Sequence, residues 1–191
     1  MVDKKTSVRS RQVALAAVFA ALYAVGVTVL APISFQVYQV RVADILLPLS
    51  ILFGPPAIIG LTIGTFVGNL SSPFGVIDIV GGAVANLIAT FLAWQIGKRR
   101  FQGAWLTGTT VEVLVITLIV GTYLSFLLQI SVWLSWIGVL VGEIIAVSVG
   151  GYLLLNGVSK ALGPRFSHRA GVQNQGSKQQ PSGPAISSSD H

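Results

Sequence analysis

Long apolar stretches follow one another along most of the chain, and they limit what it can fold into. Only 9% of its 191 residues are charged, whereas a soluble domain carries about 25%. The mean hydropathy is +0.79. A helix of about 20 apolar residues crosses the hydrocarbon core of a bilayer. The sequence therefore predicts an all-α, multi-pass protein of the cell membrane.

The apolar stretches predict six transmembrane helices. The expected segments are 13–31, 41–53, 57–70, 78–96, 105–127 and 133–155. The second and third are short for a full crossing, and Gly54-Pro55-Pro56 separates them, since proline ends one helix and favours the start of the next. They form either two tightly looped spans or a re-entrant pair, and both arrangements return the chain to the side it left.

Lysines and arginines outside the apolar stretches predict the orientation. They gather near the N-terminus, between the fourth and fifth segments and in the polar tail, and only Arg41 stands apart. With six crossings these groups share one side, which is the cytoplasm, so both termini are cytoplasmic. We expect a cytoplasmic N-terminal segment (1–10), a six-helix transmembrane domain (11–158) and a disordered cytoplasmic tail (159–191), whose Gly, Ser and Gln cannot form a core.

Several functional classes are disfavoured. The chain has no cysteine, and both histidines lie in the tail, which argues against a buried thiolate or histidine metal site. It has no phosphate-binding P-loop motif and no Gly-x-Ser-x-Gly motif. We therefore expect no enzyme, no cofactor, no metal and no nucleic-acid partner. A secretory signal peptide at the N-terminus is an alternative that the apolar character of the whole chain disfavours.

Ionisable and amide side chains inside apolar segments are the candidates for ligand binding, because they are costly in a membrane unless paired. Arg41 and Asp44 are three residues apart and share one face of a helix, either as a structural ion pair or facing a polar ligand. Carboxylates, a guanidinium, amides and rings suit a planar ligand with hydrogen-bonding groups. The candidate residues are Arg41, Asp44, Asn69, Asp78, Asn86, Trp133 and Glu143.

Other interpretations remain open for some of these positions. Asp78 lies near a helix N-terminus, where the helix dipole favours an acidic residue. Trp133 and Trp136 are also typical of an aromatic belt at the membrane surface. Glu112 falls in the cytoplasmic half of its helix, which favours a role in packing or coupling.

Small residues recur every four positions in the first and third segments. Such residues let two helices approach closely in lipid, where little hydrophobic force acts between helices. In the first segment they form a face for a partner subunit, with ordinary helix-favouring alanine as the alternative. The residues of this alanine face are Ala16, Ala17, Ala20, Ala21 and Ala24. In the third segment Gly60, Gly64 and Gly68 form a similar ridge.

Three blocks of residues carry a resemblance to a known family. They are Gln39-Val40-Arg41-Val42-Ala43-Asp44-Ile45-Leu46, Gly60-Leu61 with Gly64 and Gly68-Asn69-Leu70, and Ser72-Pro73-Phe74-Gly75 with Asp78-Ile79-Val80 and Gly82. They resemble the queuosine-precursor transporter (QueT) family, and Val139–Glu143 also fits. The resemblance extends over about residues 12–160. Asp44 departs from it, since the family usually carries the longer glutamate there.

This resemblance implies a substrate-binding S component of an energy-coupling factor (ECF) transporter. Such a subunit would bind a 7-deazaguanine, such as preQ0 or preQ1, and join a transmembrane T subunit and two ATPases. ATP would be hydrolysed by those partners. The alternative is a secondary transporter for a small polar or heterocyclic solute, driven by protons through Glu112 and Glu143. A membrane assembly factor without a ligand leaves Arg41 and Asp44 without a role.

Overall fold

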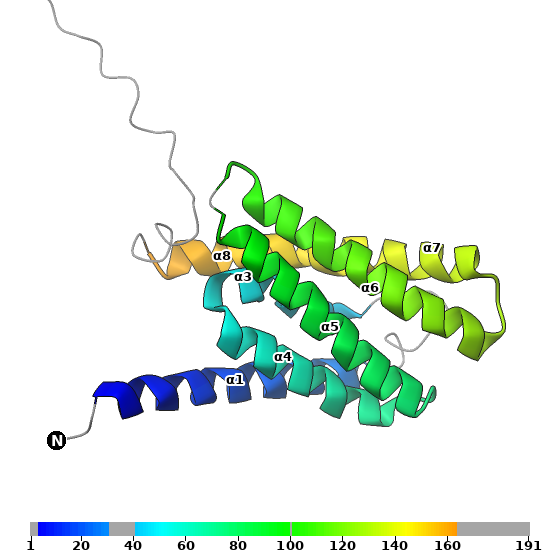
Figure 1. The fold of residues 1–191 in the computed structure, drawn as a ribbon, viewed down its shortest axis with the longest axis horizontal. Helices are drawn as coiled ribbons and strands as arrows, with labels where there is room; N and C mark the ends of the chain where they lie inside the picture. Colours follow the sequence, from blue (N-terminus) through cyan, green and yellow to red (C-terminus); the bar gives the residue numbers. More distant parts are fainter. Residues whose placement is uncertain (1–3, 31–40, 100, 164–191) are drawn as a thin grey trace, which may run out of the picture.

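In the computed structural model, which describes residues 4–30, 41–99 and 101–163, every regular element is a helix (Figure 1). The elements are α1 (Lys4–Val29), η1 (Val42–Leu49), α3 (Ser50–Phe53), α4 (Pro55–Gly68), η2 (Asn69–Ser71), α5 (Val76–Gly97), α6 (Ala104–Leu128), α7 (Val132–Glu143), η3 (Ile144–Gly151) and α8 (Tyr152–Ala161). Here η1 and η2 are 3₁₀-helices and η3 is a π-helix.

Four helical segments are long and apolar enough to cross a membrane. They are Arg9–Val29, Val76–Gly97, Ala104–Leu128 and Val132–Ala161. Large apolar side chains on their outer surfaces are exposed, as expected for contact with lipid. The chain is thus a multi-pass, all-helical membrane protein. The 14 residues of α4 extend about 21 Å, less than the roughly 30 Å of a hydrocarbon core.

Helices α1 and α4 run in the same direction and touch through their backbones. A Cβ atom added to Gly60 would lie 2.3 Å from the carbonyl oxygen of Ala16, and one added to Gly64 would lie 2.7 Å from that of Ala20. Because α1 and α4 are parallel, η1 and α3 must return the chain between them. The expected glycine ridge therefore packs against α1 inside the protein.

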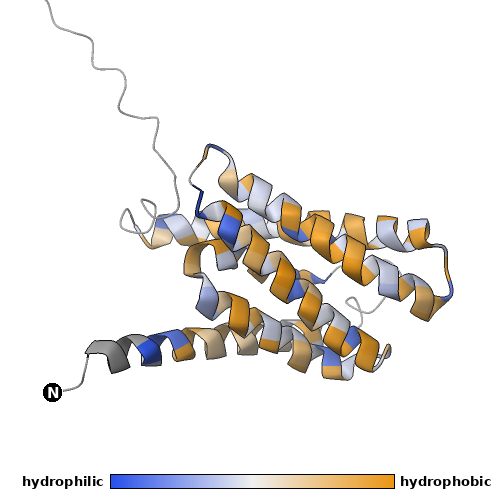
Figure 2. Ribbon diagram, viewed as in Figure 1, coloured by the Kyte–Doolittle hydropathy of each residue, from blue (hydrophilic) through white to orange (hydrophobic). Residues whose placement is uncertain are grey.

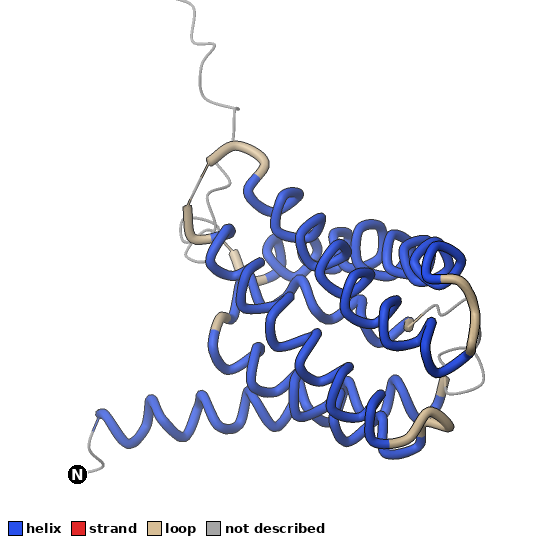
Figure 3. Tube along the Cα trace, turned by 45° about the vertical axis from the view of Figure 1, so that its right-hand side comes forward, coloured by secondary structure: helices blue, strands red, loops and turns tan. Residues whose placement is uncertain are grey.

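This path brings the described basic residues outside the core to one end of the bundle, here called the basic end. It contains the start of α1, the Gly54 turn, the α5–α6 connection and the end of α8, all toward the left of Figure 1. Figure 2 shows hydrophilic residues at the start of α1 and at the α5–α6 connection. The first turns of α1 extend beyond the bundle (Figure 3). Arg41 lies toward the opposite end, with η2 and the α6–α7 turn.

Two of the expected segments have a different local structure. The segment expected as one α-helix over 41–53 is a 3₁₀-helix followed by a single α-helical turn. Pro48 lies inside η1, where it lacks the N–H that an α-helix needs and its ring would clash with the carbonyl four residues earlier. The segment expected over 133–155 extends to Ala161 and changes from α to π at Ile144.

The two irregular helices pack against each other. A Cβ on Gly150 would lie 2.9 Å from Ile45, and one on Gly151 would lie 2.7 Å from Pro48. Glycine is therefore needed for η3 to approach η1 this closely. The expected loop at 32–38, Arg100 and most of the expected disordered tail lie outside the described residues.

The orientation is testable with single cysteines, since the chain has none of its own. We expect Ser71→Cys, at the end opposite the basic one, to react with an impermeant thiol reagent in intact cells. Gln102→Cys, in the α5–α6 connection, should react only after the membrane is opened. Both side chains are exposed. Labelling of Gln102→Cys in intact cells would contradict the cytoplasmic position of the basic end.

Candidate functional site

A buried ion pair between Arg41 and Asp78 forms the outer part of a polar cluster. The guanidinium Nη2 lies 3.1 Å from Oδ1 and 3.3 Å from Oδ2 of Asp78. The Asp78 carboxylate also accepts hydrogen bonds from the Tyr123 hydroxyl at 2.6 Å and from the Ser72 hydroxyl at 2.5 Å. The Asn69 amide donates to the backbone carbonyl of Asp78 at 3.0 Å. Asp78 is completely buried.

Arg41 and Asp44 do not share one face of a helix, contrary to the expectation from their spacing. Arg41 precedes η1 and has an extended backbone, with φ −78° and ψ 91°, so the helical spacing does not apply to it. Its ion pair is with Asp78. Asp78 lies in the first turn of α5, which Gly75 precedes, and its carboxylate faces Arg41. The role of Asp78 in the cluster therefore goes beyond favouring the start of a helix.

Asp44 belongs to a second, deeper group of hydrogen bonds. Its carboxylate accepts a short hydrogen bond from the Tyr23 hydroxyl of α1. The Asn86 amide donates to the Tyr23 hydroxyl oxygen at 2.9 Å and to the Thr65 hydroxyl at 2.7 Å. This chain of contacts connects α1, η1, α4 and α5. It fixes the position of the Asp44 carboxyl group within the bundle.

Glu143 and Glu112 extend the cluster into the core. The carboxyl groups of Asp44 and Glu143 lie within interaction distance of each other. Glu143 is the last residue of α7 and is buried. Glu112, on α6, is fully buried and accepts a hydrogen bond from the Ser50 hydroxyl at 3.3 Å. The bundle thus holds four buried carboxyl groups and one buried guanidinium among its described residues.

Gly82 leaves room for the outer part of the cluster. A Cβ atom at this position would lie 2.6 Å from Nδ2 of Asn69 and 3.2 Å from Nη1 of Arg41. The backbone of α5 therefore approaches both side chains more closely than any other residue type would allow. Larger residues at Gly82 would displace Asn69 or Arg41.

The structure brings together six of the seven expected ligand-binding residues and leaves Trp133 outside. Trp133 is 72% exposed. Its ring meets that of Trp136 edge to face, with 5.4 Å between centroids. The Trp136 N–H donates to the Thr122 hydroxyl at 3.1 Å. Trp133 is therefore at the surface near the start of α7, apart from the buried cluster.

The alanine face of α1 is divided between two environments. Ala16, Ala20 and Ala24 are half-buried, and the first two approach the glycines of α4. Ala17 and Ala21 are exposed. The exposed positions remain available to a partner in the membrane.

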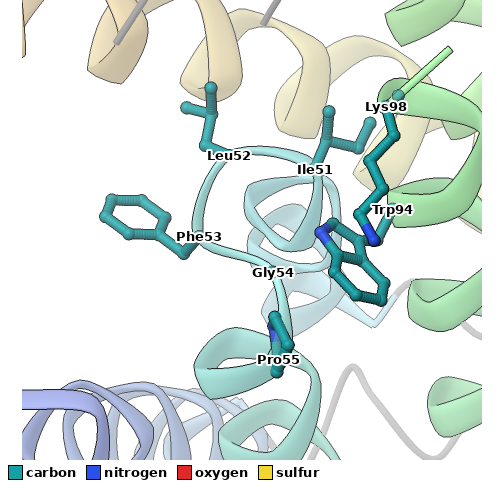
Figure 4. Close-up of a pocket in the computed structure, with 8 residues that line it drawn as sticks. Ile51, Leu52, Phe53, Gly54, Pro55, Trp94 and Lys98 are labelled. Atoms are coloured by element: carbon teal, nitrogen blue, oxygen red, sulfur yellow. The ribbon is translucent and has the colours of Figure 1, made fainter. Parts of the chain in front are cut away.

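A separate cleft lies at the basic end (Figure 4). It has a volume of about 410 Å³ and is lined by residues 51–55 together with Trp94, Gly97 and Lys98. The Lys98 ammonium lies 3.2 Å from the centroid of the Trp94 ring, a cation–π contact. None of the described residues that line it carries a carboxyl group or a buried amide, so they do not offer the hydrogen-bonding pattern expected of the site.

Four contributors to the cluster escaped the sequence analysis. Tyr23, Thr65, Ser72 and Tyr123 each donate or accept a hydrogen bond to a site residue. Tyrosine is common at membrane surfaces and threonine is common in apolar helices, so neither stands out by residue type. Tyr23 and Tyr123 could have been recognised as candidates because each lies within a predicted transmembrane segment.

Comparison with known proteins identifies one family. The family model described as QueT transporter matches residues 13–160, which is most of the chain. No curated protein and no solved structure matches the chain.

The Arg41–Asp78 pair should dominate the stability of this end of the bundle. Asp78→Asn keeps the shape of the side chain and leaves the guanidinium buried without its counter-charge. We expect it to lower the free energy of unfolding by about 3–5 kcal/mol, measured by denaturant titration in detergent micelles. Tyr123→Phe, the matched control, removes one hydrogen bond to the same carboxylate and should cost about 1.5–3 kcal/mol.

A double variant separates charge from packing. Arg41→Met combined with Asp78→Asn removes both charges, so it should be more stable than Asp78→Asn alone. If the double variant is no more stable than the single one, the loss comes from packing and the ion pair is not the cause.

Proposed function

The chain belongs to the QueT transporter family, and we propose that it is the substrate-binding S component of an ECF-type importer for a queuosine precursor. The family membership and the apolar helices make it a multi-pass membrane transporter. The proposal adds the substrate, a 7-deazaguanine taken up from outside the cell, and the assembly in which uptake occurs.

The observation that supports a ligand site is the buried polar cluster itself. In an apolar bundle, charged side chains are costly, and those that persist commonly mark substrate pathways. A 7-deazaguanine presents N1–H and an exocyclic amine, two adjacent donors that one carboxylate accepts side by side. Its O6 is an acceptor for arginine or for an asparagine amide. Arg41, Asn69 and Asp78 supply these groups within one set of contacts.

The deeper residues complete the proposed site. Asp44, Asn86 and Glu143 would contact the part of the ligand that enters furthest, and Trp133 would stack on a ligand arriving at the rim. If the basic end is cytoplasmic, Arg41 and Asp78 lie toward the outside of the cell. That position suits a subunit that captures its ligand from the medium.

Energy for uptake would come from partner subunits. The sequence has no P-loop motif, and we propose that two ATPases hydrolyse ATP for a transmembrane T subunit to which this chain binds. The alanine face of α1 would dock on that subunit, through the exposed Ala17 and Ala21 together with Ala16, Ala20 and Ala24. Small residues allow the close backbone approach that helix association in lipid requires.

A proton-coupled secondary transporter is the second candidate function. Glu112 is fully buried, lies in the same helical core as Glu143, and interacts with it electrostatically. Buried carboxyl groups in series are typical of proton relays in membrane transporters. Uptake into vesicles containing this chain alone, driven by a pH gradient without ATP, would select this function over the first.

Ligand binding is the direct test of the proposed function. We expect the purified chain to bind a 7-deazaguanine in titration calorimetry and to retain such a ligand in native mass spectrometry. Arg41→Ala should weaken binding at least 10-fold, because a charge-assisted hydrogen bond contributes about 1.5–3 kcal/mol. Leu114→Ala, an exposed position on α6, is the control and should bind normally. Absence of binding by the native chain would contradict the proposed substrate.

Assembly with the T subunit is tested at the exposed part of the alanine face. Ala21→Trp places a bulky ring on the surface of α1 without entering the α1–α4 contact. We expect it to abolish copurification with the T subunit and ATP-dependent uptake, while ligand binding by the isolated chain persists. Leu114→Trp, also at an exposed position but on α6, should assemble normally. Normal assembly of Ala21→Trp would assign this face to lipid contact alone.

A further inference from the structure

The buried cluster contains more acidic than basic groups. Among the described residues, Arg41 is the only buried basic side chain, and its ion pair is with Asp78. Asp44, Glu143 and Glu112 remain, and each has one carboxyl oxygen that is buried and makes no hydrogen bond: Oδ2 of Asp44 and Oε2 of both glutamates. The cluster therefore holds more carboxyl groups than its one guanidinium can neutralise, although Arg41 also interacts electrostatically with Asp44 and Glu143.

Asp44 and Glu143 are the two that converge. They come from different elements, the 3₁₀-helix η1 and the C-terminal end of α7, and their carboxyl groups lie within interaction distance. Tyr23 holds one oxygen of Asp44 in place. Two carboxylates brought together in a buried place repel each other unless a proton or a cation lies between them. A cationic group of a ligand would take the place of such a proton.

We propose that the Asp44–Glu143 pair is a subsite for a primary ammonium group of the ligand. An ammonium has three donors and no acceptor, so it can donate to both carboxylates at once. Charge-assisted hydrogen bonds of this kind are stronger than those between neutral groups. No three acidic or histidine side chains of the described residues are placed to hold a metal ion, which favours an organic cation over a metal.

This assignment rests on the proposed function and fixes the orientation of the ligand. The ring edge with N1–H, the exocyclic amine and O6 would lie at Arg41, Asn69 and Asp78. An ammonium-bearing substituent would point toward Asp44 and Glu143. The site would then distinguish 7-deazaguanines by the charge of that substituent, and a ligand with an aminomethyl group would bind more tightly than one with a neutral nitrile.

Glu112 is the matched control for this assignment. Its carboxyl group is buried like that of Glu143, but one oxygen accepts from Ser50, and it lies on α6 outside the converging pair. Glu112→Gln removes the same charge from the same core. It is expected to affect charged and neutral ligands alike.

The experiment compares two ligands on the full chain in detergent by titration calorimetry. They are 7-aminomethyl-7-deazaguanine, a cation, and 7-cyano-7-deazaguanine, which is neutral. We expect the native chain to bind the aminomethyl ligand at least 10-fold more tightly. Glu143→Gln should weaken binding of that ligand roughly 10- to 100-fold and change binding of the cyano ligand by less than about 3-fold. Asp44→Asn should do the same, and it provides the comparison if Glu143→Gln does not fold.

The outcomes separate this inference from the proposed function. If neither ligand binds the native chain, the proposed function fails. If both bind equally well, or if Glu143→Gln and Asp44→Asn weaken both ligands to the same extent, the 7-deazaguanine site stands and the ammonium subsite is refuted. A selective loss of the aminomethyl ligand in Glu112→Gln, with none in Glu143→Gln, would also overturn the assignment.

Discussion

The arrangement of the bundle at the end opposite the basic end depends on the contact between Arg41 and Asp78. In an apolar environment, a guanidinium without a counter-charge is costly, so these two side chains must meet wherever the backbone allows it. The contact joins the residue that precedes η1 to the first turns of α5. Tyr123 and Ser72 add α6 and the connection after η2 to the same carboxylate. The Asp78 carboxylate thus joins four segments: the residue before η1, α5, α6 and the connection after η2.

Departures from α-helical geometry occur where the acidic side chains converge. Asp44 lies in a 3₁₀-helix that contains Pro48, and Glu143 ends an α-helix that continues as a π-helix. Such irregular helices are often found at functional sites, because they change the direction of side chains that a regular helix would fix. Gly150 and Gly151 allow η3 to pack directly on η1. The two irregular helices therefore pack against each other, with Asp44 inside η1 and Glu143 directly before η3.

The sequence predicted the class of fold and most residues of the buried polar cluster for a common reason. Lipid tolerates few polar groups, so each polar residue within an apolar stretch was significant, and Arg41, Asp44, Asn69, Asp78, Asn86 and Glu143 were found in this way. Their pairing could not be derived, because the helical spacing of Arg41 and Asp44 holds only on a helix and Arg41 precedes one. For Trp133 the residue type alone could not predict the location, since an aromatic residue is equally suited to a ligand site and to the membrane surface.

Helix α1 connects the proposed ligand site with the proposed partner surface. Its half-buried alanines pack on the glycines of α4, while Tyr23 reaches Asp44 and receives a hydrogen bond from Asn86. Ala17 and Ala21 remain exposed on the same helix. Because a small-residue contact places two backbones in direct van der Waals contact, a shift of α1 relative to α4 is resisted over the whole length of that contact. The hydroxyl of Tyr23 and the exposed alanines are therefore parts of one rigid element, and the position of Asp44 is tied to the helix that carries the proposed partner surface.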